Sequence, residues 1–211
     1  MNESQKIEAI LKDIDELFVF IHDLIDEQKL NLDDQYKRIN YTYFKMFCCH
    51  FESIYILTTN NHFSSAILLM RTVLELFVKS FYFEFIEKEK DSCVEDFLDG
   101  KKDFPNFFLM TKALEEYTHV SFGDFKESFK QFTKSGLASY EKFSLFSHGR
   151  GETLKAFYKN NKISYTTEQV SDVLLTAKGL FEQLSLLLFF TQNKPNDVGL
   201  LLKKIKDLTN R

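Results

Sequence analysis

The sequence has few of the residues that interrupt helices, and it has no tryptophan. Only 7 Gly and 2 Pro occur among 211 residues, and neither type appears before Gly100. Average usage would give roughly two dozen or more of these residues in a chain of this length. The scarcity excludes collagen-like and turn-rich all-β architectures. With 44% hydrophobic and 27% charged residues, the composition also differs from that of disordered chains.

Cysteines and excess charge are scarce as well. Cys48, Cys49 and Cys93 form no CxxC pair, which argues against a zinc site and against a secreted disulfide framework. The net charge of −4 disfavours binding to nucleic acid through overall charge. The N-terminus lacks an apolar signal segment, and the uncharged runs are interrupted or short. We therefore expect a cytoplasmic protein without a membrane span.

Apolar residues recur every three or four positions through most of the chain, as they do on the buried face of a helix. This spacing predicts long helices over residues 3–29, 33–58, 63–90 and 166–191. Short turns between long helices favour antiparallel neighbours. We expect an all-α bundle of long antiparallel helices in a single domain over residues 1–211.

Two regions depart from the long-helix pattern. Residues 91–165 are less regular, and they are predicted to form an insertion of short helices. An amphipathic helix is expected near the C-terminus, and its polar face is basic. The ranges of these shorter helices are 106–118, 122–134, 137–147 and 196–209.

Helix-start signals support these boundaries. The acidic pair Asp33-Asp34 suits the beginning of the second helix. Thr166 and Gln169 have the spacing of a capping box, with Thr166 at the N-cap.

The chain lacks Walker, GxGxxG, HExxH, GxSxG and EF-hand patterns. One Glu-x-x-His occurs at Glu116–His119, but a di-iron bundle needs a second copy and further inward carboxylates. We therefore expect no cofactor and no tightly bound metal.

Arg71 is one of only four Arg and lies in the most apolar segment of the chain. Glu75 follows four residues later, so the two side chains share a helical face and can pair. One interpretation is a narrow solvent-facing stripe of Arg71, Glu75 and Lys79. The other is a buried or cleft-lining polar site, because guanidinium is suited to fixed, partly buried charge.

A second candidate segment covers residues 143–151. Ser144, Ser147, His148 and Arg150 place two hydroxyls, an imidazole and a guanidinium beside two glycines. His can exchange protons near neutral pH, and glycine permits close backbone approach. We regard these residues as candidate ligand-binding or catalytic groups; a polar loop at a helix end is the alternative.

Together, the segments at 64–75 and 144–149 resemble a group of uncharacterised bacterial all-helical proteins. Those proteins share an Arg-x-x-x-Glu helix and a downstream Ser…His-Gly element, and the group resembles the HEPN-like superfamily. The resemblance implies that Arg71, Glu75 and His148 converge on one site. It also implies a role in phage defence or a toxin–antitoxin system.

Two functional hypotheses follow from the sequence, and the resemblance supports the first. In the first, the protein is a metal-independent ribonuclease in which Arg71 stabilises phosphate charge and His148 shuttles a proton. No Arg is followed by a His four to seven residues later, so Arg and His would meet from separate segments. In the second, it is a noncatalytic helical module that binds a protein partner or small ligand, and Arg71–Glu75 is a structural pair.

A homodimer is also expected, because 33 Phe and Tyr residues can exceed what one core hides.

Overall fold

The protein was analysed as a computed structural model, which describes residues 3–117, 155, 158–161 and 163–210. Within these ranges the chain forms helices and turns, and no strand occurs. The predicted all-α fold is confirmed. The expected helices at 122–134 and 137–147 lie outside the described residues.

Five long helices make up the bundle, and shorter helical segments lie beside them in the described chain. The long helices are α1 (Glu3–Leu24), α2 (Gln35–Thr59), α3 (Phe63–Tyr82), α8 (Thr167–Thr191) and α9 (Pro195–Thr209). The shorter segments are η1 (Glu27–Lys29), η2 (Phe83–Glu87), α4 (Val94–Leu98) and α5 (Phe107–Glu116).

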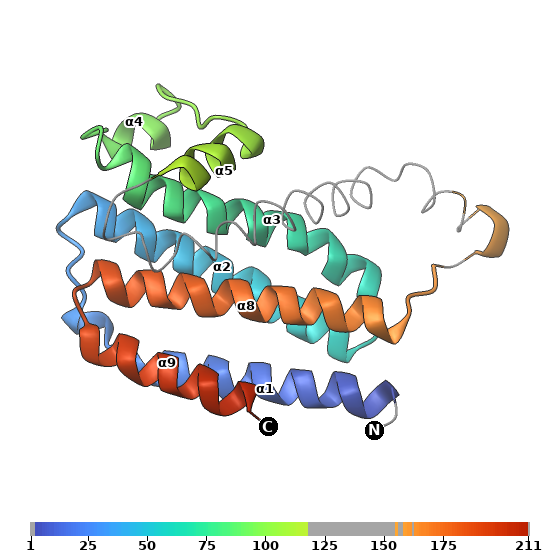
Figure 1. The fold of residues 1–211 in the computed structure, drawn as a ribbon. Helices are drawn as coiled ribbons and strands as arrows, with labels where there is room; N and C mark the ends of the chain where they lie inside the picture. The colour runs from blue at the N-terminus through green and yellow to red at the C-terminus, as the bar shows by residue number, and fades with distance from the viewer. Residues whose placement is uncertain (1–2, 118–154, 156–157, 162, 211) are drawn as a thin grey trace.

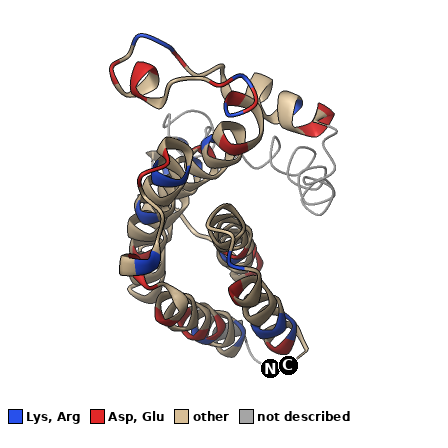
Figure 2. Ribbon diagram, turned by 90° about the vertical axis from the view of Figure 1, so that its left-hand side faces the viewer, with Lys and Arg blue, Asp and Glu red and all other residues tan. Residues whose placement is uncertain are grey.

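The long helices that short turns connect run antiparallel, as predicted: α1 to α2, α2 to α3, and α8 to α9 (Figure 1). Helices α3 and α8, which no short turn connects, run in the same direction (Figure 1). The helix α8 packs against α1, α2 and α3, and α9 packs against α1 and α8. An end-on view shows α4 and α5 beyond α3 at one edge of the bundle, with acidic and basic residues interspersed along the helices (Figure 2). Helix α8 is therefore the central element of the bundle.

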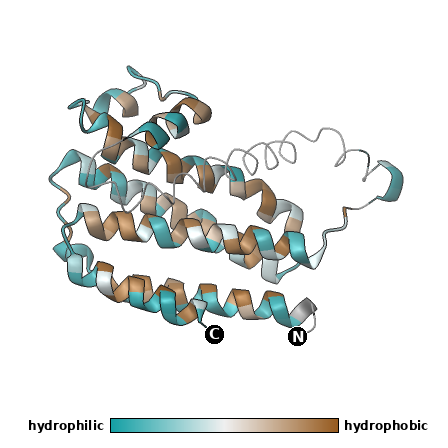
Figure 3. Ribbon diagram, in the orientation of Figure 1, coloured by the Kyte–Doolittle hydropathy of each residue, from teal (hydrophilic) through white to brown (hydrophobic). Residues whose placement is uncertain are grey.

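Phe181 on α8 is the hub of the core. It is fully buried and lies within 4.8 to 6.2 Å, between ring centroids, of four other Phe side chains. These rings come from α1 and α2 and belong to Phe18, Phe44, Phe47 and Phe51. Hydrophobic residues recur along the helices and hydrophilic residues occupy the turns (Figure 3). Packing of this aromatic set joins α1 and α2 to α8.

The predicted helix starts agree with the structure. The Asp34 carboxylate accepts hydrogen bonds from the backbone N–H groups of Tyr36 and Lys37, both at 2.9 Å. Thr166 and Gln169 form the complete capping box of α8. Pro195 is the first residue of α9, so this helix begins one residue before its predicted start.

Two predicted helices change character before their expected ends. The segment at 3–29 is α-helical only to Leu24, and the Asp26 carboxylate then accepts from the Gln28 N–H and starts a 3₁₀ turn. The segment at 63–90 is α-helical to Tyr82 and continues as the π-helical turn η2. In that turn the N–H of Lys88 donates to the carbonyl of Phe83, five residues earlier, at 3.0 Å.

The C-terminal helices bear on two further predictions. Helix α8 is long and apolar enough to cross a membrane, and 67% of its most apolar 18-residue window is buried in the protein. The cytoplasmic location and the lack of a membrane span stay predictions.

On α9, Leu201 and Leu208 are buried, while Leu200 and Leu202 are about half exposed. The expected homodimer also stays a prediction.

Candidate functional site

Arg71 and Glu75 lie one turn apart on α3 and form an ion pair. The Arg71 Nε donates to Glu75 Oε1 at 3.1 Å, and each side chain is about one-third exposed (31% and 32%). The pair is therefore partly exposed, which fits both the solvent-facing stripe and a polar site that lines a cleft. Lys79, the third member of that stripe, is also half-buried.

The remaining residues of the predicted site are Ser144, Ser147, His148 and Arg150. All four lie outside the described residues. Convergence of His148 with Arg71 and Glu75 therefore stays a prediction.

A different carboxylate is buried at the end of the same helical segment. Glu84, in η2, is 7% exposed and accepts a hydrogen bond from the Asn40 side-chain amide of α2 at 2.9 Å. The Asn40 carbonyl oxygen accepts in turn from the Ser80 hydroxyl at 2.7 Å. Lys88 Nζ pairs with the other oxygen of Glu84 at 2.5 Å. A buried polar cluster thus links α2, α3 and η2.

The charge of Glu84 is only partly compensated. Burial raises the pKa of Glu84, and the ammonium groups of Lys88 and Lys37 oppose this rise. The Asp34 carboxylate acts in the same direction as burial. A buried carboxylate whose charge is incompletely paired is less stable than the neutral carboxyl. Glu84 therefore takes up a proton more readily than an ordinary Glu.

Glu87, three residues further on, has a different environment. It is 2% exposed and accepts hydrogen bonds from Lys90, Lys102 and Ser92, at 2.9, 2.5 and 2.7 Å. Burial tends to raise the pKa of Glu87, but these donors outweigh it and lower the pKa to about 2. Because Lys102 belongs to the loop after α4, Glu87 fastens that loop to η2.

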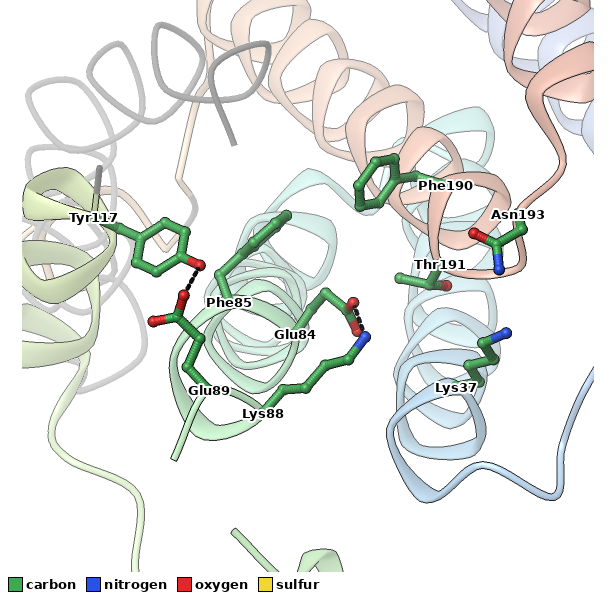
Figure 4. A pocket seen from close by; sticks show the side chains of 9 residues that line it. All are labelled: Lys37, Glu84, Phe85, Lys88, Glu89, Tyr117, Phe190, Thr191 and Asn193. Atoms are coloured by element: carbon green, nitrogen blue, oxygen red, sulfur yellow. Dashed lines mark hydrogen bonds and ion pairs between the residues drawn. The ribbon is translucent and has the colours of Figure 1, made fainter. Parts of the chain in front are cut away.

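A cavity of about 390 Å³ opens beside Glu84. Phe85 and Tyr117 lie on one side, Lys37 and Asn193 on the other, and the Glu84–Lys88 pair lies between them (Figure 4). The cavity is also lined by Glu89, Phe190 and Thr191. Its volume is within the range of about 300 to 1,000 Å³ that is usual for small-molecule sites.

Local structure explains how these side chains are brought together. Thr191 and Asn193 lie where α8 turns into α9, and Asn193 has a positive φ of 55°, which Asn tolerates better than most residues. Tyr117 ends α5, and its hydroxyl donates to Glu89 at 2.5 Å. The π-helical turn η2 supplies Glu84 and Phe85, and single π turns are frequent at functional sites.

Two polar groups in the cavity make no hydrogen bond or ion pair within the described ranges. These are the ammonium of Lys37 and the side-chain amide of Asn193. Both oxygens of Glu84 and one of Glu89 are occupied. The unused hydrogen-bonding capacity at the Lys37 end therefore includes a positively charged donor.

No group of three or more His, Cys, Asp or Glu side chains within the described residues could hold a metal ion. The predicted absence of a metal and of a cofactor stays a prediction for the whole chain.

Sequence reasoning missed Glu84 and Glu87, although a signal was present. Residues Val73, Phe77 and Ser80 are buried on α3, and steps of three or four residues continue this face to Glu84 and Glu87. Two carboxylates on a buried helical face indicate a polar site. The partner Asn40 lies on another helix, so periodicity along one helix could not identify it.

Comparisons of the chain with protein-family models, with curated proteins and with solved structures found no match. The relationship to HEPN-like proteins therefore stays a prediction from the two short sequence segments.

Proposed function

We propose that this protein is a noncatalytic helical module that binds a small apolar carboxylate in the Glu84 cavity. The observation that carries the proposal is the Lys37 ammonium, which lines this cavity without a hydrogen bond or ion pair to any described residue. Charged donors bind carboxylates by charge-assisted hydrogen bonds.

The rest of the cavity limits the class of ligand. The rings of Phe85, Tyr117 and Phe190 offer an apolar wall, and their centroids lie 5.8 and 6.4 Å apart around Phe85. Glu84 and Glu89 add negative charge beside the two lysines, so a single negative charge suits the site better than a phosphate dianion. An aromatic monocarboxylate combines both properties.

Binding of phenylacetate to the full chain, measured by calorimetry or NMR, tests the proposal. A Lys37→Gln variant should lose about tenfold or more in affinity, because a hydrogen bond to a charged group contributes roughly 1.5–3 kcal/mol. Lys12→Gln removes an exposed α1 lysine outside the cavity and should change the affinity by less than twofold. Absence of binding, or equal loss in both variants, would contradict the proposal.

A second candidate function is a metal-independent ribonuclease in a bacterial defence or toxin–antitoxin system. The Arg71–Glu75 pair at 3.1 Å favours it, because Glu75 holds a guanidinium that still reaches solvent. In this proposal Arg71 stabilises phosphate charge, and His148 shuttles a proton during attack by the RNA 2′-hydroxyl.

Incubation of single-stranded RNA with the full-length protein, in the presence of a metal chelator, tests this second candidate. Cleavage that is lost in both Arg71→Ala and His148→Ala variants, with folding retained, supports the ribonuclease. Cleavage that survives both substitutions, or no cleavage at all, counts against it.

A further inference from the structure

A second cavity lies between α1 and α2, away from the Glu84 cavity. It has a volume of about 360 Å³, and the two cavities share no lining residue. Five of the side chains around it are apolar or aromatic: Ile14, Phe18, Phe51, Tyr55 and Ile56. Two of these side chains, Phe18 and Phe51, also stack on the core ring of Phe181.

The only charged residues that line this cavity are acidic. Asp15 comes from α1 and Glu52 from α2, so each helix contributes one carboxylate. Within the described part of the chain, neither side chain forms a hydrogen bond or an ion pair. Both carboxylates are exposed to solvent, and a cation in the cavity would lie near both negative charges.

Tyr55 adds a third unused group. Its ring has no aromatic or cationic neighbour, and its hydroxyl no hydrogen bond, among the residues that the structure describes. The face of a Tyr ring attracts ammonium ions, and aromatic residues together with carboxylates are the usual components of organic-cation sites. The half-buried Phe18 supplies apolar surface for the rest of a ligand.

We infer that the cavity between α1 and α2 is a binding site for a small apolar organic cation, such as a substituted ammonium. Asp15 and Glu52 would neutralise its charge, Tyr55 would contact the cationic group, and the apolar side chains would cover its hydrocarbon part. This site requires a ligand of opposite charge to the one proposed for the Glu84 cavity. The two proposals therefore stand independently.

Titration of the full chain with benzyltrimethylammonium, followed by NMR, tests the inference. We expect saturable binding with shifts of the Phe18 and Tyr55 ring signals. The double substitution Asp15→Asn/Glu52→Gln should weaken binding about tenfold, and Tyr55→Leu should weaken it about threefold.

A matched control is Asp172→Asn/Asp207→Asn, which removes two exposed carboxylates that do not line the cavity. It produces the same change in net charge and should alter the affinity by less than twofold. Lys37→Gln should also leave binding of the cation unchanged.

Three results would overturn the inference. One is the absence of saturable binding by the wild-type chain. Another is an equal loss of affinity in Asp15→Asn/Glu52→Gln and in the control double variant. The third is phenylacetate shifting the Phe18 and Tyr55 signals as strongly as benzyltrimethylammonium does.

Discussion

Glu84 and Glu87 are both buried, lie three residues apart in one π-helical turn, and have opposite pKa shifts. Glu84 has one lysine and one neutral amide as hydrogen-bond partners, and its pKa is raised. Glu87 has two lysines and a hydroxyl, and its pKa falls to about 2. Burial alone therefore does not decide the charge of a carboxyl; the hydrogen-bond donors and charges around it contribute as well.

The different surroundings of the two carboxyls suit different roles, a structural one for Glu87 and a binding one for Glu84. Glu87 connects η2 to Lys102 in the loop after α4, and it also accepts hydrogen bonds from Lys90 and Ser92. Glu84 faces the cavity that also contains Lys37 and the aromatic wall. We therefore expect substitutions at Glu87 to change stability, and substitutions around Glu84 to change ligand binding and its pH dependence.

The largest expected effect is at Glu87. Glu87→Gln should lower the free energy of unfolding at pH 7 by about 3 kcal/mol, since a pKa shift of one unit corresponds to about 1.4 kcal/mol. The lowered pKa of Glu87 means that its stabilisation is present above the unfolded pKa and is lost as pH falls toward about 2. Urea denaturation at pH 7 measures the change.

Asp172→Asn, an exposed substitution on α8, is the control for Glu87→Gln and should change stability by less than about 0.5 kcal/mol. Equal stability of the two variants would show that Glu87 does not fasten the loop.

An intermediate effect is expected at Asn40. Asn40→Ala removes the amide that donates to Glu84 and should cost about 2 kcal/mol, because a buried carboxylate oxygen loses its partner. Thr42→Ala, an exposed α2 position, should cost less than about 0.5 kcal/mol. Thermal or urea unfolding of both variants checks this, and a neutral Asn40→Ala would contradict the buried cluster.

A smaller effect is expected at Glu84 itself. Glu84→Gln should change stability at pH 7 by less than about 1 kcal/mol, because it removes a charge whose burial is only partly compensated. Because the pKa of Glu84 is raised in the folded state, the folded protein takes up a proton at a higher pH than the unfolded chain does. The wild type should therefore gain stability relative to Glu84→Gln as the pH falls from 7 toward 4.5.

Urea denaturation of both proteins at several pH values measures this difference. A constant difference across the range would show that the pKa of Glu84 is not raised by folding.

The smallest effect is expected at Arg71. Arg71→Ala should cost about 0.5 kcal/mol, since a partly exposed pair four residues apart on a helix contributes roughly 0.2–0.5 kcal/mol. A loss of 3 kcal/mol or more in urea denaturation would instead indicate that Arg71 is a structural lock.

The sequence predicted the long helices well for a physical reason. Periodicity and the absence of Gly and Pro before Gly100 report on local backbone preference, and α1, α2 and α3 follow these signals. The Arg71–Glu75 pair was also predictable, because both residues belong to one helix and lie four positions apart.

The Glu84 cavity depends on tertiary structure instead. Lys37, Tyr117 and Asn193 are distant in sequence and meet Glu84 only when their helices pack. The π-helical turn replaces the expected α-helix at 83–87, and no residue type in that stretch predicts a hydrogen bond to the fifth preceding carbonyl. The periodicity of the sequence therefore predicted the helical segment at 63–90, but it did not predict the cavity beside Glu84.

The most direct test of this account is a ¹³C NMR titration of the Glu84 and Glu87 side-chain carboxyls in the folded protein. The account predicts that Glu84 titrates above its ordinary value of 4.5, while Glu87 stays ionised until the pH approaches about 2. Two carboxyls that titrate together near 4.5, or a Glu84 that titrates below Glu87, would contradict the assignment of binding and structural roles.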